Sequence, residues 1–222
     1  MQLKRKYENQ TRQTIVKCAA RLFADNGFHG TGVREIVDKA GVALNSVNYY
    51  FGSKDNLFLE TIKFVLKEKI QFDLLFLQED EVIPEKPQAL SNFVNEKIMG
   101  IFDIFYGTNR RYWYADLVQR AFQEEVPGSL EVAMTYISIV FDRFGEIYPV
   151  AQKGKMDAVE YYNWMTRLWF SILGFATWRN TFGKELDFVG FAENADRDAY
   201  IAGYSKTIAA NAIKELGLPA AK

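Results

Sequence analysis

Residues 31–54, TGVREIVDKAGVALNSVNYYFGSK, constrain the fold more than any other stretch, because they combine two short helical patterns with a turn between them. In the first pattern, apolar residues recur at the spacing of one helix face: Val33, Ile36, Val37 and Ala40. Thr31 stands where a helix N-cap is expected, and Gly41 ends the pattern with the residue type that best tolerates a left-handed conformation. The stretch therefore predicts a helix-turn-helix.

The second helical pattern, residues 44–51, has a narrow apolar side and a polar outer side. Its inward stripe consists of Val47, Tyr50 and Phe51, and its outward positions are Leu44, Asn45, Ser46, Asn48 and Tyr49. Asn and Ser side chains hydrogen-bond base edges or phosphates when such a helix enters a major groove. Ser53 then offers a cap for the next helix, and Asp55 lies near the positively polarised end of that helix.

Several side chains of this motif are candidates for contact with DNA. Lys54 and Tyr50 are suited to phosphates, whereas asparagine and serine side chains are suited to bases. The full set is Thr31, Arg34, Leu44, Asn45, Ser46, Asn48, Tyr49, Tyr50 and Lys54. Residues 1–8 are expected to be a loose arm that either reaches DNA or remains a solvated tail, and its basic side chains are Lys4, Arg5 and Lys6.

The charge distribution indicates a polyanionic partner at one end of the chain. Residues 1–55 hold nine Lys or Arg against five Asp or Glu, whereas the whole chain of 222 residues has a net charge of −1. The single cysteine, Cys18, lies on an apolar helical stripe and is expected to be a core thiol. The sequence has neither an apolar signal segment nor a stretch long enough to span a membrane, so we expect a cytoplasmic protein.

The motif resembles the DNA-binding domain of TetR-family repressors over about the first 65 residues. The resemblance depends on Ala-Gly-Val at residues 40–42 and on VNYYFGSKD at residues 47–55. It also includes Thr11-Arg12, Ala19-x-x-Leu22-Phe23 and Gly27-Phe28. Two positions depart from the family pattern, since Ala43 stands where Ser or Thr is usual and Asn48 where Tyr is usual. The first departure weakens a helix cap, and the second alters an expected contact with DNA.

The remaining sequence predicts further helices. A long helix is expected from Ser53 to about Leu77, joining two domains, and others near residues 88–106, 110–125, 129–148, 156–182 and 196–216. A first helix is expected at residues 9–26. The predicted fold is therefore all-α, with a three-helix DNA-binding domain at residues 1–55 and a helical ligand-binding and dimerisation domain at residues 56–222.

Aromatic residues are numerous between the predicted domain boundary and the last helix. Core packing explains each of them singly, but together they are compatible with a pocket for an aromatic or amphipathic small molecule. The candidates are Phe102, Phe105, Tyr106, Trp113, Phe122, Tyr136, Phe141, Trp164 and Trp169.

Small residues form faces on the last two predicted helices. The pattern is equally consistent with packing inside one chain and with a dimer interface, whereas the family resemblance implies a four-helix interface between two copies. The candidates are Arg167, Ser171, Gly174, Trp178, Ser205, Ala209 and Ala212.

An enzyme is not supported by the sequence. We find no glycine-rich phosphate loop, metal-ligand cluster or nucleophile-base pattern, and the acidic pair Glu124-Glu125 is expected to be a solvated helix end. We expect no cofactor and no metal. The sequence predicts a homodimeric regulator that represses from a near-palindromic operator and is released by a small-molecule effector. The alternatives are a ligand-independent DNA-binding dimer and a regulator whose ligand acts as co-repressor.

Overall fold

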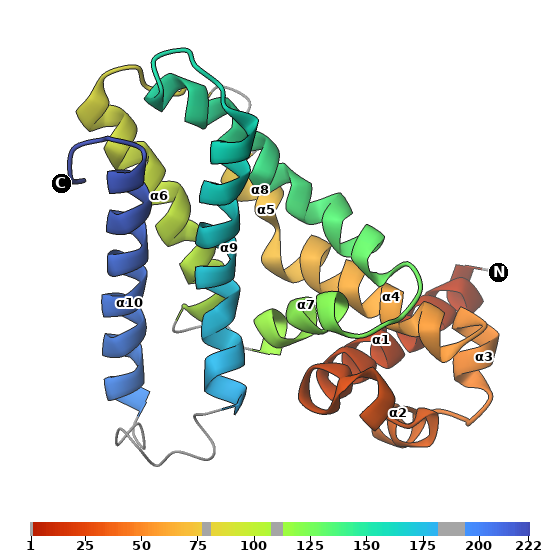
Figure 1. Cartoon of the computed structure of the whole chain (residues 1–222). Helices are drawn as coiled ribbons and strands as arrows, with labels where there is room; N and C mark the ends of the chain where they lie inside the picture. Colours follow the sequence, from red (N-terminus) through yellow and green to blue (C-terminus); the bar gives the residue numbers. More distant parts are fainter. Residues whose placement is uncertain (1, 77–80, 108–112, 182–193) are drawn as a thin grey trace. The chain divides into compact units, whose positions relative to one another are not determined.

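The computed structural model describes residues 2–76, 81–107, 113–181 and 194–222, and its regular structure is helical (Figure 1). No strand occurs within these ranges. The all-α prediction is confirmed. The chain divides into two compact units, one formed by Met1–Gln71 and Trp113–Tyr136 and the other by Phe72–Tyr112 and Ile137–Lys222. The predicted boundary at residue 55 stays a prediction.

Unit 1 is built around α1 (Gln2–Gly30), which packs against α4 (Lys54–Val65) and α7 (Trp113–Gln123). The small helices α2 (Val33–Ala40) and α3 (Ser46–Phe51) lie at one end of it. Three phenylalanine rings meet in the core with centroids 5.1 to 6.0 Å apart: Phe23, Phe28 and Phe58. Such aromatic packing holds α1 against α4.

The N-terminal segment is helical and not a loose arm. The backbone of α1 begins at Gln2, several residues before the predicted start. Gln, Leu, Lys and Arg all have favourable helix propensity, so the helix extends upstream of its apolar stripe. The side chains of Lys4, Arg5 and Lys6 lie outside the described part of the structure.

The predicted long helix from Ser53 to Leu77 is wrong, because it is interrupted. After α4, one π-helical turn, η1 (Leu66–Ile70), ends at Gln71, whose φ of 56° and ψ of 54° are left-handed. A separate short helix, α5 (Phe72–Phe76), follows, and Leu77 lies outside the described residues. The sequence does not signal this break, because Gln71 is neither glycine nor proline and apolar residues continue on both sides of it.

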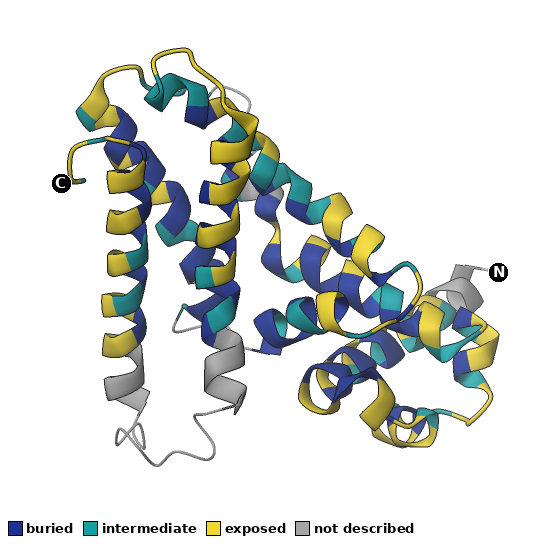
Figure 2. Ribbon diagram, viewed as in Figure 1, coloured by how far each residue is buried: buried dark blue, intermediate teal, exposed yellow. Residues whose placement is uncertain are grey.

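Unit 2 contains α5, α6 (Pro87–Tyr106), α9 (Ala158–Thr181) and α10 (Asn194–Glu215). It also contains the part of α8 (Ser129–Ala151) from Ile137 onward. The helix α10 packs against α6 and α9, and each of these helices has a buried side and an exposed side (Figure 2). The predicted helices at 88–106, 129–148, 156–182 and 196–216 are present within these ranges. Among the described residues, no helix is long and apolar enough to cross a membrane.

Polar side chains also tie the helices of unit 2 together. The Tyr106 hydroxyl donates to the Ile172 carbonyl at 2.7 Å, and the Trp164 indole donates to the Ala212 carbonyl at 3.1 Å. Each bond satisfies a polar group that burial would otherwise leave unpaired. The arrangement of α6, α9 and α10 is therefore specified by hydrogen bonds as well as by packing.

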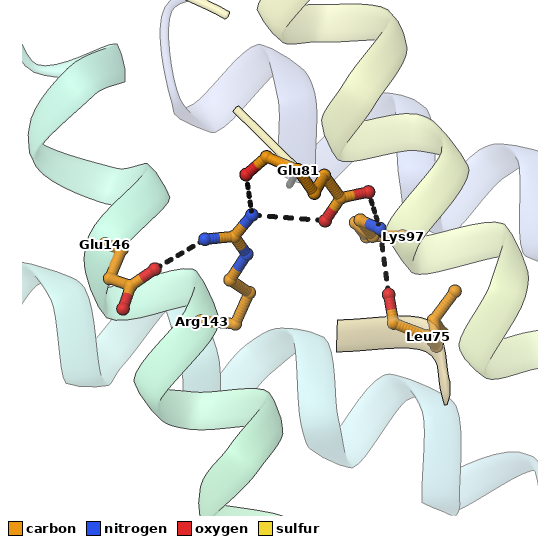
Figure 3. Close-up of polar contacts among 5 residues, drawn as sticks. All are labelled: Leu75, Glu81, Lys97, Arg143 and Glu146. Carbon is orange, nitrogen blue, oxygen red and sulfur yellow. Dashed lines mark hydrogen bonds and ion pairs between the residues drawn. The ribbon is translucent and has the colours of Figure 1, made fainter. Parts of the chain in front are cut away.

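A buried ion-pair cluster joins the segment after α5 to α6 and α8 (Figure 3). The ammonium of Lys97 is fully buried, and it donates to the Leu75 carbonyl at 2.8 Å and to the Glu81 carboxylate. Arg143 donates to the same carboxylate at 3.1 Å and to Glu146 at 2.6 Å. The pKa of Arg143 is raised, because its bonds to these carboxylates outweigh the lowering by burial.

Candidate nucleic-acid interface

The first helix of the motif, α2, is held in place by its apolar face and by its C-terminal turn. Ile36 and Val37 are buried, and Gly41 adopts φ 67° and ψ 36°. The N–H of Gly41 donates to the Asp38 carbonyl at 3.2 Å, and that of Val42 donates to the Val37 carbonyl at 3.0 Å. The predicted end of the helix at Gly41 is confirmed, because the left-handed turn satisfies carbonyls that the helix leaves free.

The second helix of the motif, α3, presents a polar and aromatic surface to solvent. Val47 and Phe51 are buried, whereas Leu44 is 54% exposed and Tyr49 is 72% exposed. Asn45 and Asn48 are also exposed, and Ser46 and Tyr50 are half-buried. The predicted inward and outward faces are therefore present, with Tyr50 at their border. The rings of Tyr49 and Tyr50 meet edge to face, with centroids 4.8 Å apart.

No side chain caps the start of α3. Ala43 supplies its backbone carbonyl to the Ser46 N–H at 2.9 Å, so one turn forms ahead of the helix without a side-chain hydroxyl. Asn45 then takes the capping position with helical φ and ψ. This leaves the Asn45 side chain on the exposed side of the motif.

Two predictions about residues flanking the motif have opposite outcomes. Ser53 caps α4 as predicted, since its hydroxyl accepts the Asn56 N–H at 3.1 Å. Thr31 was expected to cap α2, but Gly32 takes that position. The Thr31 side chain is only 1% exposed, and its hydroxyl donates to the Leu22 and Gly27 carbonyls. Thr31 therefore stabilises the turn from within, and we leave it out of the proposed contact surface.

Basic side chains surround α3 at the surface of unit 1. Arg34 is exposed on α2, and the ammonium of Lys54 lies over the ring of Phe28. Burial lowers the pKa of Lys54, although the negative charges of Asp55 and Glu124 oppose this shift. The guanidinium of Arg12 lies 5.1 Å from the centre of the Phe51 ring. Cationic groups from α1, α2 and α4 thus lie in or next to the helix-turn-helix motif.

An ion-pair network supports this surface from α1 and α4. Arg12 pairs with Glu60, which also accepts from Lys63 at 3.0 Å. Burial raises the pKa of Glu60, but hydrogen bonds from Arg12 and Lys63 outweigh it, and the pKa is lowered. Arg12 was not among the residues predicted for this surface, because its two contacts, with Phe51 and Glu60, are distant along the chain.

The predicted ligand-pocket residues do not gather at one place. Trp113, Phe122 and Tyr136 belong to unit 1, where Phe122 is 39% exposed. The other six belong to unit 2: Phe102, Phe105, Tyr106, Phe141, Trp164 and Trp169. Among these, Trp169 contacts both Phe105 and Phe141, at centroid distances of 6.3 and 5.9 Å. Phe102 and Tyr106 line a groove of about 200 Å³ between α6 and α10.

The predicted dimer residues separate into an exposed group and a buried group. Arg167 is exposed on α9, where it pairs with Glu215 at 2.8 Å, and Ser171 and Gly174 are half-buried. On α10, residues predicted for the interface are instead covered by their own unit: Ser205, Ala209 and Ala212. The small side chains of Ser205 and Ala209 pack within the chain and offer little surface to a second copy, whereas Ala212 borders an open groove between α9 and α10. The Trp178 side chain lies outside the described part.

The prediction that Glu124 is a solvated helix end is also wrong. Its side chain is 11% exposed, and its carboxylate accepts the Phe28 N–H at 3.2 Å. Glu125, next to it, is exposed as expected. The sequence does not separate the two, since the partner of Glu124 is a backbone group 96 residues away.

The fold and this surface define an all-helical chain with a helix-turn-helix motif near its N-terminal end and further helices after it. The sequence profile for "Bacterial regulatory proteins, tetR family" matches residues 15–61. Residues 15–61, which include α2 and α3, thus match a family of bacterial regulatory proteins. The predicted family resemblance is confirmed.

Curated relatives match mainly at the N-terminal end. The chain is 31% identical over 91 residues to the HTH-type transcriptional repressor KstR2 of Mycolicibacterium smegmatis, covering 41% of this chain and 39% of that protein. It is 34% identical over 55 residues to the HTH-type transcriptional regulator RutR of Escherichia coli, covering 25% and 26%. The chain therefore matches well under half the length of these relatives.

Solved structures match over most of the chain at low identity. The FadR regulator of Bacillus subtilis, in complex with stearoyl-CoA, has a TM-score of 0.64 at 14% identity, over 91% of this chain and 98% of that one. GusR of Salmonella enterica has a TM-score of 0.61 at 16% identity, over 94% and 96%. These similarities establish the shared fold.

Proposed function

We propose that this protein is a dimeric transcriptional repressor that places α3 of each copy in a major groove of a near-palindromic operator. The observation that carries the proposal is the exposed face of α3, where two asparagines and a tyrosine point away from the buried Val47 and Phe51. Asparagine side chains bind adenine through two hydrogen bonds. The flanking Arg34 and Lys54 suit phosphates, which fix the position of such a helix on the duplex.

The dimer forms through the exposed side of α9 and α10. An open groove there is lined by Trp164, Arg167, Leu168, Phe170, Ser171, Ile208, Asn211, Ala212 and Glu215. Phe170 is 68% exposed and Tyr162, on the same helix, is 59% exposed. Large apolar side chains at the surface are typical of a face that a second copy covers. This surface replaces the small-residue face of α10 as the proposed interface.

The repressor is released from DNA by a small molecule bound in unit 2. The groove between α6 and α10 is the candidate site, since it combines Phe102, Tyr106 and Met99 with the polar Asp103 and Ser205. The complex of the related FadR with stearoyl-CoA supports an amphipathic ligand for this fold. A co-repressor ligand, or no ligand at all, is the alternative that titration distinguishes.

The test begins with selection of duplexes from a random pool by the full-length protein. Enrichment of one near-palindromic sequence is expected, and the lack of any enrichment would contradict the proposal. Amphipathic carboxylates and acyl-CoA thioesters are then screened for stabilisation of the protein and titrated into the complex. A stabilising compound is expected to lower the affinity of the protein for the operator. Thermodynamic linkage then requires that the operator lower the affinity for the compound by the same factor. Tighter operator binding would make it a co-repressor.

The interface is tested at Gly174, where no heavy atom of the described residues lies within 4 Å of an added Cβ. Gly174→Glu therefore fits the single chain and is expected to disrupt the dimer by placing charge in its interface. Sedimentation should show monomers with weakened operator binding. Gly203→Glu places the same charge on α10, at a position where an added Cβ also meets no described atom within 4 Å. It tests whether the effect is confined to α9. A Gly174→Glu dimer with normal DNA binding would move the interface elsewhere.

A further inference from the structure

The geometry points to Glu124, just beyond α7, as a positioning residue for DNA binding: we propose that its carboxylate holds the α1–α2 turn in the form that α3 requires. The inference rests on the proposed DNA-binding function. The residue lies far outside the segment 15–61 that matches the family's DNA-binding domain. All contacts that support it lie within unit 1.

The turn needs an acceptor that its own segment does not supply. Gly27 adopts φ 75° and ψ 173°, which interrupts the helical backbone of α1 just before Phe28. Phe28 is buried, so its N–H must find a partner in place of the regular helical carbonyl. The Glu124 carboxylate accepts this N–H at 3.2 Å. A bond to a charged acceptor is about twice as strong as one between neutral groups.

The carboxylate is itself held close to the turn. Arg120, one helical turn earlier on α7, lies 3.4 Å from the same oxygen. A Cβ added to Gly27 would lie 2.5 Å from that oxygen. Gly27 is therefore needed both for its backbone conformation and for the approach of Glu124.

Phe28 connects this anchor to the motif. Its ring meets Phe58 of α4 at a centroid distance of 5.4 Å, and the Lys54 ammonium lies 4.3 Å from its centre. Lys54 is the first residue of α4, and α3 ends at Phe51. By fixing the Phe28 backbone, Glu124 fixes the surface on which the start of α4 is seated, three residues after the end of α3. The DNA-binding unit is thus completed by a helix from the second half of the chain.

The test compares full-length variants on the duplex that the wild-type protein selects. Glu124→Ala removes the acceptor and is expected to lower the affinity for that duplex about tenfold. This is the effect of losing one charge-assisted hydrogen bond. Glu124→Gln retains an acceptor oxygen and should recover most of the affinity. Glu125→Ala, at the exposed neighbour, is the control and should bind as the wild type does. If the alanine variant does not fold, Glu124→Met, which keeps the side-chain length, takes its place.

Two readouts separate positioning from simple stabilisation. Affinities are measured at a temperature at which circular dichroism shows every variant folded, so a loss of stability alone leaves them unchanged. Exchange of the Phe28 amide hydrogen should accelerate in the alanine or methionine variant and not in Glu125→Ala. Wild-type affinity in a folded variant without the acceptor would overturn the inference and leave the proposed function intact. If the wild type selects no duplex, the proposed function fails and this inference fails with it.

Discussion

The ammonium group of Lys54 lies 4.3 Å from the centre of the Phe28 ring, so the first residue of α4 is seated on the turn that precedes α2. A cation over an aromatic face is held by the quadrupole of the ring, which restricts a long and flexible side chain. The charge that is proposed to meet a phosphate is therefore already ordered before DNA arrives.

Replacing Lys54 by alanine is expected to lower the affinity of the protein for all duplexes by a similar factor. Phosphate contacts do not depend on base sequence, and each one contributes about one counterion to the salt dependence of binding. Titrations at several salt concentrations should give a log–log slope reduced by about one. Lys153→Ala, in the exposed turn after α8, should leave the slope unchanged. A loss confined to the selected sequence would show that Lys54 reads bases.

Asn45→Ala and Asn48→Ala are expected to act on the selected duplex and not on unrelated ones. A lost base contact costs about 1–3 kcal/mol at the position that it reads. Affinity for the selected and for a scrambled duplex, measured in the same buffer, gives the comparison. Equal losses on the two duplexes would mean that these asparagines only position the helix.

The ion pair between Arg12 and Glu60 is expected to stabilise the protein near neutral pH and to lose this effect in acid. The pKa of Glu60 is lowered in the folded protein, so its contribution is present above the unfolded pKa and disappears as pH falls through the folded pKa. Melting temperatures of the wild type and Glu60→Gln should therefore differ at pH 7 and converge at low pH. Because the Arg12 side chain is 41% exposed, we expect the ion pair to contribute only about 0.2–1 kcal/mol to the free energy of unfolding. A difference that grows in acid would contradict this assignment.

Glu81→Ala is expected to be strongly destabilising, although Glu81 lies in an irregular segment. Its carboxylate is shared by Lys97 and Arg143, and Lys97 is fully buried. Removing one partner of a buried pair costs about 3–5 kcal/mol, because the remaining charge is left without compensation. Urea unfolding measures this cost, and the double variant Glu81→Gln with Lys97→Met should recover part of it. Glu85→Ala, in the same segment but exposed, is the control.

The features that were predicted correctly depend on residues close together in the chain. The turn at Gly41, the cap at Ser53 and the inward face of α3 are each set by the backbone conformation or spacing of a few neighbours. Local periodicity and turn chemistry are sufficient for such features. The same reasoning predicted most helices of unit 2.

The errors occur where distant residues or an unusual backbone conformation decide the outcome. Glu124 resembles its neighbour Glu125 in sequence, but only Glu124 has a backbone partner in the α1–α2 turn. Gln71 breaks the predicted long helix in a left-handed conformation that non-glycine residues seldom adopt. Ala209 is a small residue on a helix face, and the sequence alone does not state whether α6 of the same chain or a second copy covers that face.

The cluster around Glu81 also determines where the chain tolerates added sequence. Residues 81–86 have no regular secondary structure, and such segments usually accept inserted peptides or a new pair of termini. Here, however, the segment supplies the counter-charge of a buried lysine, so an insertion beside Glu81 would pull that carboxylate out of the interior. The exposed residues 153–156 have no ion pair among the described contacts, and they lie before Asp157, whose carboxylate accepts backbone N–H groups at the start of α9. A fluorescent tag or a circular permutation should therefore be placed after α8 and kept away from the entrance to α6.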